Sequence, residues 1–399
     1  MTAWRLLAVL FAARAAMAFQ FQSAAALSPY LAERHGADLG AIGLLIGLYL
    51  APGLVAAYPG GRIGRRFGER QVVLFGLVLM AAGGIVAALP AGWGMQLGAR
   101  VLAGAGGVLL NILMSKMVAD AFAGGRLATA MGIFVNSWPV GIALALLVLP
   151  PVAEGAGLGA ALWLVAGLVV AGLIVFALGT RPRAEVPAAV AAPPVGRLAG
   201  PALAGAVLTG AVWGLYNGAL GMVFGFGPAL LAERGWAPVP AGQMTSAVLW
   251  LVALSVPLGG WLADRTGRRD TVLWGGLGAF ALLLVLGAVS GAEAGVAAVA
   301  IFLAIGLVSG LPAGPIMSLP AGVLPPPVRA EGMGVFFTLF YLGTMGGPLV
   351  AGWLSDLSGS AAASFLLGAA MLLLCFPVLV AARRMAQRVA AMEAHAHSA

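Results

Sequence analysis

Two arginines lie inside long apolar segments of the sequence, and both could bind an anion. Arg14 stands about nine residues into the first segment and Arg100 about seven residues into the fourth. A charge at the centre of a membrane helix costs about 2.5–3.5 kcal/mol, so it normally faces a cavity and has a use. All 13 acidic residues fall in loops or at segment ends, so neither arginine has an obvious carboxylate partner. Because a guanidinium offers five donors in a planar fork, it suits a carboxylate or a small oxyanion. The alternative is structural, with both arginines donating to backbone carbonyls, water, Gln20 or Gln22.

Helical spacing places further side chains beside each arginine. At 100° per residue, Phe21 shares the face of Arg14, and Gln22 lies on its flank. Asn111 shares the face of Arg100, together with glycines that leave room for a ligand or for a packed neighbouring helix. These five residues are our predicted substrate-binding set in the first half of the chain.

The elements that must position these residues are membrane helices. Hydrophobic residues make up 62% of the chain and charged residues 9%, whereas a soluble protein carries about 25% charged residues. Apolar segments of about 20 residues match helices that cross a membrane, and a closed barrel would show short alternating strands instead. The predicted spans are 5–30, 40–61, 70–90, 93–115, 126–150, 157–179, 203–231, 240–263, 270–289, 294–318, 331–354 and 361–382.

One long polar and proline-rich stretch divides these spans six and six. We therefore predict an all-α membrane protein with twelve transmembrane helices in two six-helix bundles, residues 1–180 and 201–384, joined by a linker at 181–200 and followed by a tail at 385–399. If both termini are cytoplasmic, 17 of the 21 Lys and Arg residues fall on the cytoplasmic side, while the acidic residues divide about evenly. The positive-inside rule then places both termini in the cytoplasm. No basic face is left over for nucleic acid.

Signatures of enzymes and cofactors are missing from the sequence. Cys375 is the only cysteine, and the three histidines lie in loops or the tail without a ligand cluster. No Ser/His/Asp set lies within the apolar segments, and no nucleotide-binding loop is visible. We predict no catalytic activity, no cofactor and no bound metal.

A loop segment occurs twice, 199 residues apart. Residues 61–70 (GRIGRRFGER) return as residues 260–269 (GWLADRTGRR), and Arg65 stands at the position of Asp264. Asp264 can accept hydrogen bonds from a helix N-terminus or an arginine and so latch the cytoplasmic side. Arg65 cannot make that contact, so we expect unequal latches, and we expect the arginines to bind anionic lipid or only to set topology. The predicted gating residues are Gly61, Arg65, Arg66, Gly68, Gly260, Asp264, Arg265, Gly267, Arg268 and Arg269.

These motifs resemble those of the major facilitator superfamily. Residues 260–269 match its loop signature, and residues 100–107 (RVLAGAGG) and 343–352 (GTMGGPLVAG) resemble two further motifs of the family. The resemblance implies alternating access, with spans 1, 4, 7 and 10 lining a central cavity. Within the family, residues 14–23 (RAAMAFQFQS) and 59–61 look most like the cyanate/nitroimidazole-type branch. Nitrate and nitrite carriers are expected to have paired arginines in spans 2 and 8, which this sequence lacks.

The same repeat offset extends into the predicted cavity. It maps Arg14 onto Trp213, and Tyr216 and Asn217 continue the face of Trp213. The cation therefore belongs to the first half only, and the second half contributes an aromatic and amide surface. We add Trp213, Tyr216 and Asn217 to the predicted substrate-binding residues.

The combined prediction is a multi-pass secondary transporter of the inner membrane that moves a small anionic solute. Its partners would be that solute and membrane lipids, in a monomer. No titratable carboxylate is found in the predicted cavity, so a coupling ion, a counter-substrate or uniport all stay open. One alternative is efflux of a hydrophobic drug or metabolite, with both arginines structural. A transport-inactive membrane sensor is the other, although the short linker and tail argue against it.

Overall fold

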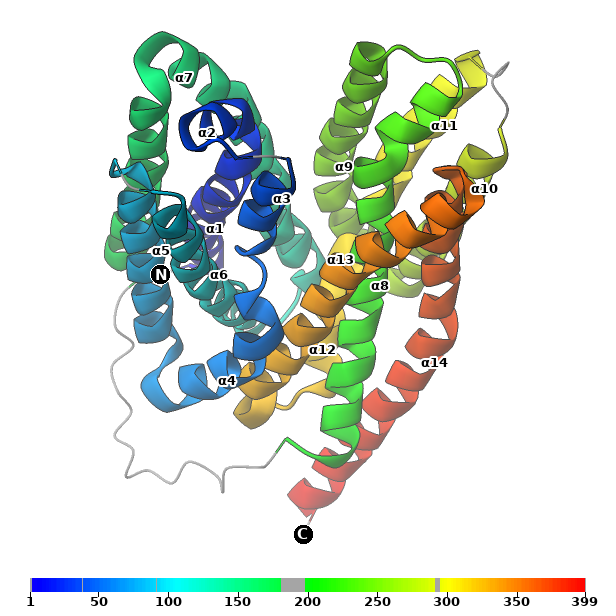
Figure 1. Cartoon of the computed structure of the whole chain (residues 1–399). Coiled ribbons are helices and arrows are strands. Elements are labelled where there is room, and N and C mark those ends of the chain that lie inside the picture. Colours follow the sequence, from blue (N-terminus) through cyan, green and yellow to red (C-terminus); the bar gives the residue numbers. More distant parts are fainter. Residues whose placement is uncertain (1, 38, 91, 181–197, 291–294, 399) are drawn as a thin grey trace. The chain divides into compact units, whose positions relative to one another are not determined.

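The computed structural model describes residues 2–37, 39–90, 92–180, 198–290 and 295–398. Most of the predicted linker, residues 181–197, and the side chains of the end of the predicted tail, residues 393–399, lie outside the described part. Regular structure in the described residues is entirely helical (Figure 1). The helices are α1 (Ala3–Ala26), α2 (Ser28–His35), α3 (Leu39–Gly47), α4 (Pro52–Phe67), α5 (Glu69–Ala88), α6 (Trp93–Ala121), α7 (Leu127–Gly179), α8 (Gly200–Glu233), α9 (Pro238–Thr266), α10 (Arg269–Val289), α11 (Gly295–Ser309), α12 (Ala313–Val323), the 3₁₀ turn η1 (Pro326–Val328), α13 (Arg329–Ser358) and α14 (Ala362–Ser398).

The described residues contain 11 helical segments long and apolar enough to cross a membrane, and one of them holds two spans. That segment is α7, whose 53 residues far exceed the roughly 20 that a bilayer requires. Gly157 interrupts α7 with φ 86° and ψ 160°, a conformation that glycine adopts without steric cost. The prediction of an all-α protein with twelve membrane-crossing helices is confirmed.

Two predicted spans are broken rather than continuous. The span predicted at 40–61 consists of α3 and α4, and the span predicted at 294–318 consists of α11 and α12. Pro52 begins α4 and Pro312 caps α12, because proline lacks the N–H that a helix interior needs but fits a first turn. An unbroken apolar run in the sequence conceals such breaks. At the other end of the chain, α14 stays helical through Ser398, across most of the predicted tail.

The chain forms two compact units, and each exchanges one helix start with the other. Unit 1 comprises residues 1–121, 137–198 and 326–338. Unit 2 comprises residues 122–136, 199–325 and 339–399. Thus α7 begins in unit 2 and continues in unit 1, whereas α13 begins in unit 1 and continues in unit 2. This exchange places the first turns of both helices against the repeated loop segments.

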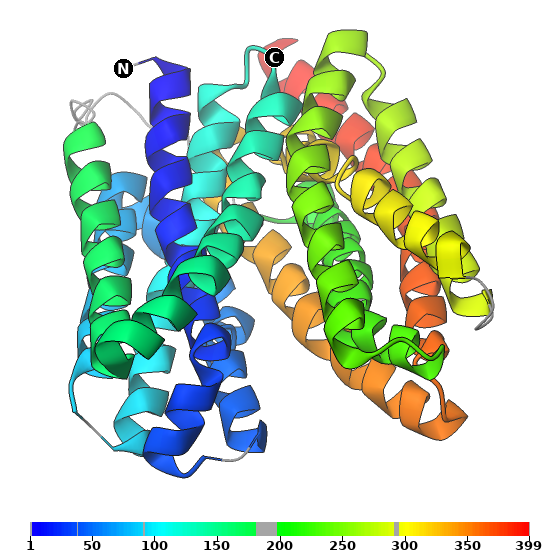
Figure 2. The ribbon, with the colours of Figure 1, turned by 90° about the horizontal axis from the view of Figure 1, so that it is seen from above.

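In unit 1, α1 lies between the two arms of α7 (Figure 2). The spacing is close because small residues face one another: Gly141 lies against Ala15 and Ala18, and Gly172 lies against Ala16. On the other side, α6 packs against α1, α4 and α5. The close backbones let polar side chains of α1 reach acceptors on α6 and α7.

In unit 2, α8 is the helix around which α9, α12 and α14 pack. Its last residue, Glu233, accepts hydrogen bonds from the Ala361 N–H at 2.6 Å and the Ser360 hydroxyl at 2.7 Å. Arg234 donates to Ser290 Oγ at 2.8 Å and to the Gly287 carbonyl. The two charged residues therefore cap the start of α14 and the end of α10.

Candidate functional site

Arg14 is buried in unit 1 and is held by side chains from two other helices. Its exposed fraction is 5%. Nε donates to Asn111 Oδ1 on α6 at 3.0 Å, and Nη1 donates to Ser137 Oγ on α7 at 3.0 Å. Both of these acceptors are neutral oxygens, and they orient the guanidinium. The sequence had placed Asn111 beside Arg100, but in the structure it binds Arg14.

Aromatic rings surround this arginine. The Arg14 guanidinium carbon lies 5.7 Å from the centroid of the Trp138 ring, close enough for a cation–π interaction. Trp138 packs on Phe21 at 5.0 Å between ring centroids, and Phe21 meets Tyr49 edge-on at 5.5 Å. Phe21 thus lines the same region as Arg14, as its helical position predicted.

Arg100 is pinned to the backbone of α1. Nη1 donates to the Gln20 carbonyl at 2.6 Å, Nη2 donates to the Phe21 carbonyl at 2.5 Å, and the Tyr49 ring lies 5.2 Å from the guanidinium carbon. With an exposed fraction of 6%, Arg100 joins α6 to the outer part of α1. This geometry matches the structural alternative for Arg100 given by the sequence. Gln22, the other polar candidate on α1, is partly exposed.

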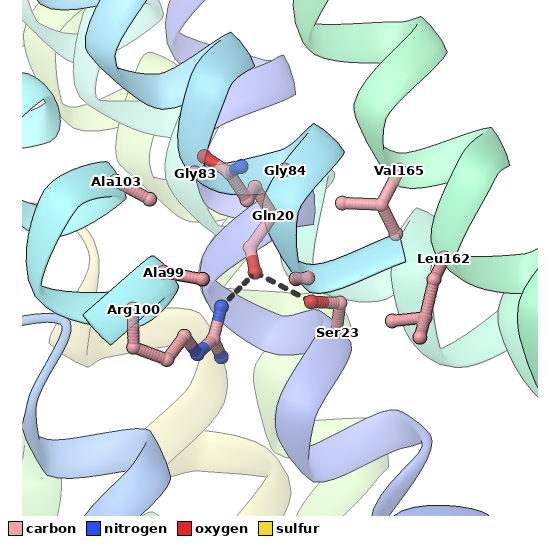
Figure 3. A pocket seen from close by; sticks show the side chains of 10 residues that line it. Gln20, Ser23, Gly83, Gly84, Ala99, Arg100, Ala103, Leu162 and Val165 are labelled. Carbon is pink, nitrogen blue, oxygen red and sulfur yellow. Dashed lines mark hydrogen bonds between the residues drawn. The ribbon is translucent and has the colours of Figure 1, made fainter. Parts of the chain in front are cut away.

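A small cavity lies beside Arg100 inside unit 1 (Figure 3). Its polar lining comes from Gln20, Ser23 and Arg100, and Ser23 and Arg100 both donate to the Gln20 carbonyl. The rest of the lining is glycine, alanine, Leu162 and Val165. Its volume of about 20 Å³ holds a single water molecule at most. The cavity is therefore too small for an organic substrate.

The predicted residues of unit 2 form an aromatic cluster on α8. Trp213 stacks on Tyr216 at 5.4 Å and on Phe340 of α13 at 6.1 Å. The Tyr216 hydroxyl donates to the Ser309 carbonyl at 2.8 Å, and Asn217 Nδ2 donates to the Trp213 carbonyl at 2.8 Å. Trp213 and Tyr216 are buried, whereas Asn217 is half-buried.

The loop segment of unit 2 holds the start of α7. Asp264 accepts from the Thr129 N–H at 2.7 Å and from the Thr129 hydroxyl at 2.8 Å. Arg269 donates to the other carboxylate oxygen at 2.9 Å. A negative charge at a helix start is favourable, because the unpaired N–H groups there carry a partial positive charge. Gly260 permits the approach, since a Cβ there would collide with the Ala128 carbonyl.

The loop segment of unit 1 holds the start of α13 through a residue that the sequence reasoning missed. Glu331 accepts from the Tyr58 hydroxyl at 2.7 Å and pairs with Arg65 at 3.1 Å. Its side chain is only 7% exposed. Arg329, two residues earlier, pairs with Asp120 of α6. Arg65 therefore has its own acidic partner. The offset of 199 residues between the loop segments aligns Glu331 with Gly132 and not with Thr129, so the repeat did not reveal this partner.

The remaining residues of the two loops lie at the surface or at helix ends. Gly68 and Gly267 have φ of 84° and 67°, and each ends its helix. Arg265 stacks on Trp261 at 4.9 Å from guanidinium carbon to ring centroid. Arg66 and Arg268 are exposed. In the described ranges there is no group of three or more His, Cys, Asp or Glu side chains that could hold a metal ion.

Comparison with known proteins agrees with this architecture. Inner membrane transport protein YajR of Escherichia coli (strain K12) is 30% identical over 148 residues. The match spans 37% of this chain and only 32% of YajR. Among solved structures, human MFSD10 (TETRAN), described as an organic anion transporter, has a TM-score of 0.78 at 19% identity and covers 95% of this chain and 100% of its own.

Two further solved structures share the fold. The proton:xylose symporter XylE has a TM-score of 0.74 at 16% identity and covers 97% of this chain and 96% of its own. The Escherichia coli fucose:proton symporter FucP has the same TM-score and identity, with 94% and 98% covered. The family model of the Major Facilitator Superfamily matches residues 9–227 and 202–394. The chain, a multi-pass membrane protein and not an enzyme, therefore belongs to the major facilitator superfamily of transporters.

Proposed function

We propose that this protein carries a small organic or inorganic anion across the inner membrane by alternating access, with Arg14 as the anion-binding group. The observation that supports this most is the setting of Arg14 within a membrane span, buried and oriented by Asn111 and Ser137. These acceptors are neutral, and a charge acts more strongly where water is excluded. The rigid guanidinium fork gives bidentate recognition of a carboxylate or small oxyanion.

A second group of proposed substrate-binding residues lies within unit 2 and is aromatic and amide in character. Trp213 occupies the repeat position of Arg14, and Tyr216 and Asn217 lie on the same helix. Flat aromatic side chains pack against a planar anion, and the Asn217 amide supplies hydrogen-bonding groups. The likeness of the fold to an organic anion transporter is consistent with this substrate class. Within that class, the cyanate/nitroimidazole-type branch is our proposal for the subfamily.

The two loop segments act as gates on the cytoplasmic side, and both chain termini face the cytoplasm. The Lys and Arg bias supports this orientation, and the relative YajR is an inner membrane protein. Asp264 holds the start of α7 in the closed form, while Arg66, Arg265 and Arg268 are free to meet anionic lipid headgroups. Fusions of a fluorescent protein and of alkaline phosphatase to each end test the orientation. Phosphatase activity at either terminus would contradict it.

Uptake into proteoliposomes tests the substrate class. The purified protein is screened with labelled small anions, and Arg14→Ala and Arg14→Lys are measured beside the parent. We expect Arg14→Ala to abolish uptake and Arg14→Lys to restore binding poorly, because lysine is a point charge without the fork. Arg234→Gln is the matched control, since Arg234 caps α10 with backbone and hydroxyl acceptors. Wild-type rate and affinity in Arg14→Ala would refute the proposal.

Efflux of a hydrophobic compound is the second candidate, and the aromatic surroundings favour it. Phe21, Trp138 and Tyr49 in unit 1 and Trp213 and Phe340 in unit 2 form ring clusters of the kind that bind flat lipophilic molecules. In that case Arg14 would be structural. Competition decides between the two functions, because lipophilic cations would displace such a substrate and small anions would not.

A further inference from the structure

The two helix starts pack on the repeated loop segments in the same way. A Cβ on Gly61 would collide with the Ala330 carbonyl of α13, and a Cβ on Gly260 would collide with the Ala128 carbonyl of α7. The contact is reciprocal. A Cβ on Gly334 of α13 would collide with the Ala57 carbonyl of α4, and a Cβ on Gly132 of α7 would collide with the Val256 carbonyl of α9. Backbone packing alone therefore does not distinguish one helix start from the other.

The loop residues that make the polar contacts carry opposite charges in the two units. In unit 1 the loop is basic and the helix start is acidic, with Arg65 and Tyr58 on Glu331. In unit 2 the loop residue that makes the contact is acidic and the helix start supplies donors, with Asp264 accepting from the Thr129 N–H and hydroxyl. The polarity of the interaction is thus exchanged between the two copies.

The exchange involves several positions at once. Position 58 is a tyrosine that donates to the carboxylate, and its repeat counterpart Pro257 has no donor. Arg329, which precedes Ala330, adds a second ion pair to the start of α13 through Asp120. The residue that precedes Ala128 at the start of α7 is Leu127, which is buried and apolar. Each loop is therefore matched to its helix start at more than one residue.

We propose that this exchanged polarity determines which helix start each loop segment accepts. With the pairing swapped, the Glu331 carboxylate would face Asp264, and Arg65 would face the Thr129 N–H at the positive end of α7. Both contacts are repulsive, while the glycine packing would be unchanged. The glycine contacts are of the same kind in both units, so they cannot exclude the wrong helix start. The charged residues would have to exclude it. The inference rests on the proposed gating role of the loops, and it makes each gate reclose on its own helix in every transport cycle.

Single substitutions reproduce each mismatched contact without moving either helix. Thr129→Glu puts an acid against Asp264, and Glu331→Thr puts a helix start without an acid against Arg65. The readout is maleimide labelling, in native membranes, of a cysteine that replaces Ala128 or Ala330, residues that are at most 2% exposed. Cys375→Ala supplies the background, since Cys375 is the only native cysteine. We expect each substitution to raise the labelling rate about tenfold, which corresponds to about 1.4 kcal/mol.

Compensating substitutions then convert one latch into the other. Asp264→Arg added to Thr129→Glu installs the unit 1 polarity in unit 2, and Arg65→Asp added to Glu331→Thr installs the unit 2 polarity in unit 1. Both double variants should return to within about twofold of the parent rate, because coupled partners restore a lost interaction energy of this size. Arg66→Asp is the matched control, since it changes the loop charge equally one residue away from the pair.

The result that overturns the proposal is a failure of both double variants to recover. Labelling in Arg66→Asp as fast as in Glu331→Thr would also overturn it, because net loop charge would then explain the effect. Melting temperatures in detergent identify variants that merely unfold. Labelling needs no substrate, so loss of the anion assignment would leave this result intact, and recovery here would not rescue that assignment.

Discussion

Neutralising Asp264 should weaken the contact between this residue and the start of α7, and the loss of free energy follows from the bonds that the carboxylate receives. The carboxylate is 8% exposed and receives two bonds from Thr129, at 2.7 and 2.8 Å, and one at 2.9 Å from Arg269. Asp264→Asn keeps an acceptor but loses the charge. Hydrogen bonds to charged groups exceed neutral ones by about 1 kcal/mol each. The favourable interaction with the helix start contributes about 0.3–2 kcal/mol. The Arg269 pair adds about 0–1 kcal/mol, because Arg269 is half exposed.

The helix-start term describes the same contact as the Thr129 bonds, so we take the two bonds alone, about 2 kcal/mol, as the expected loss for Asp264→Asn. This loss corresponds to about a 30-fold shift from the held to the released form of the α7 start. The assay is the rate of maleimide labelling of Ala128→Cys in the Cys375→Ala background, because Ala128 is fully buried against Gly260 in this structure. Asp264→Ala removes the acceptors as well and should shift the population further, provided that its melting temperature shows the protein to be folded.

Asp270→Asn is the control for this measurement. Asp270 lies six residues further on, is 70% exposed, and pairs with Arg383 at 2.5 Å. Exposed pairs contribute about 0–1 kcal/mol, so labelling should rise less than about fivefold. If Asp264→Asn labels within twofold of the parent, the carboxylate does not hold the helix start, and our reasoning about the latch is refuted.

Three further predictions concern stability, measured as melting temperature in detergent. Arg100→Met should lower it, because the Gln20 and Phe21 carbonyls each lose a hydrogen bond from a charged donor, at about 1.5–3 kcal/mol each, while anion affinity stays unchanged. Glu233→Gln should destabilise by about 1 kcal/mol through the cap of α14, whereas Glu33→Gln, at an exposed glutamate near the end of α2, should have no effect. Burial and, to a lesser degree, Arg34 lower the pKa of His35. The unfolded chain then binds more protons, so stability should fall as the pH drops below about 6.5, and His35→Gln should reduce that slope; an unchanged slope contradicts the assignment.

The sequence specified the helices well because hydrophobicity and the repeat act over long, regular stretches. It did not reveal where spans 2 and 10 break, since Gly47 and Ser309 end helices inside runs that remain apolar. Proline positions were visible, but a proline also occurs inside intact helices, as Pro59 does in α4. Only the surrounding packing decides which proline begins a helix.

The partners of the two membrane arginines show a different limit. Asn111 shares the face of Arg100 on a helical wheel but stands 11 residues further along, about 16 Å away at the rise of an α-helix. It therefore meets a different part of α1 and binds Arg14. Ser137 lies 123 residues from Arg14, and no local pattern connects them. Angular position follows from sequence, whereas depth and the choice of neighbouring helix follow from tertiary packing.

The proposed latches and the proposed anion site would use different chemistry, because their charged groups lie in different surroundings. At the helix starts, Glu331 and Asp264 face cationic or N–H partners beside exposed arginines, so water can replace each bond as the latch opens. Arg14 lies within a membrane span, where the neutral oxygens of Asn111 and Ser137 accept from it and fix its orientation. A carboxylate in place of Asn111 would form a buried ion pair, and a substrate anion would then have to compete with it at a cost of several kcal/mol. Neutral acceptors avoid that competition, which is the physical reason for assigning the anion to Arg14 and the latching to the helix starts.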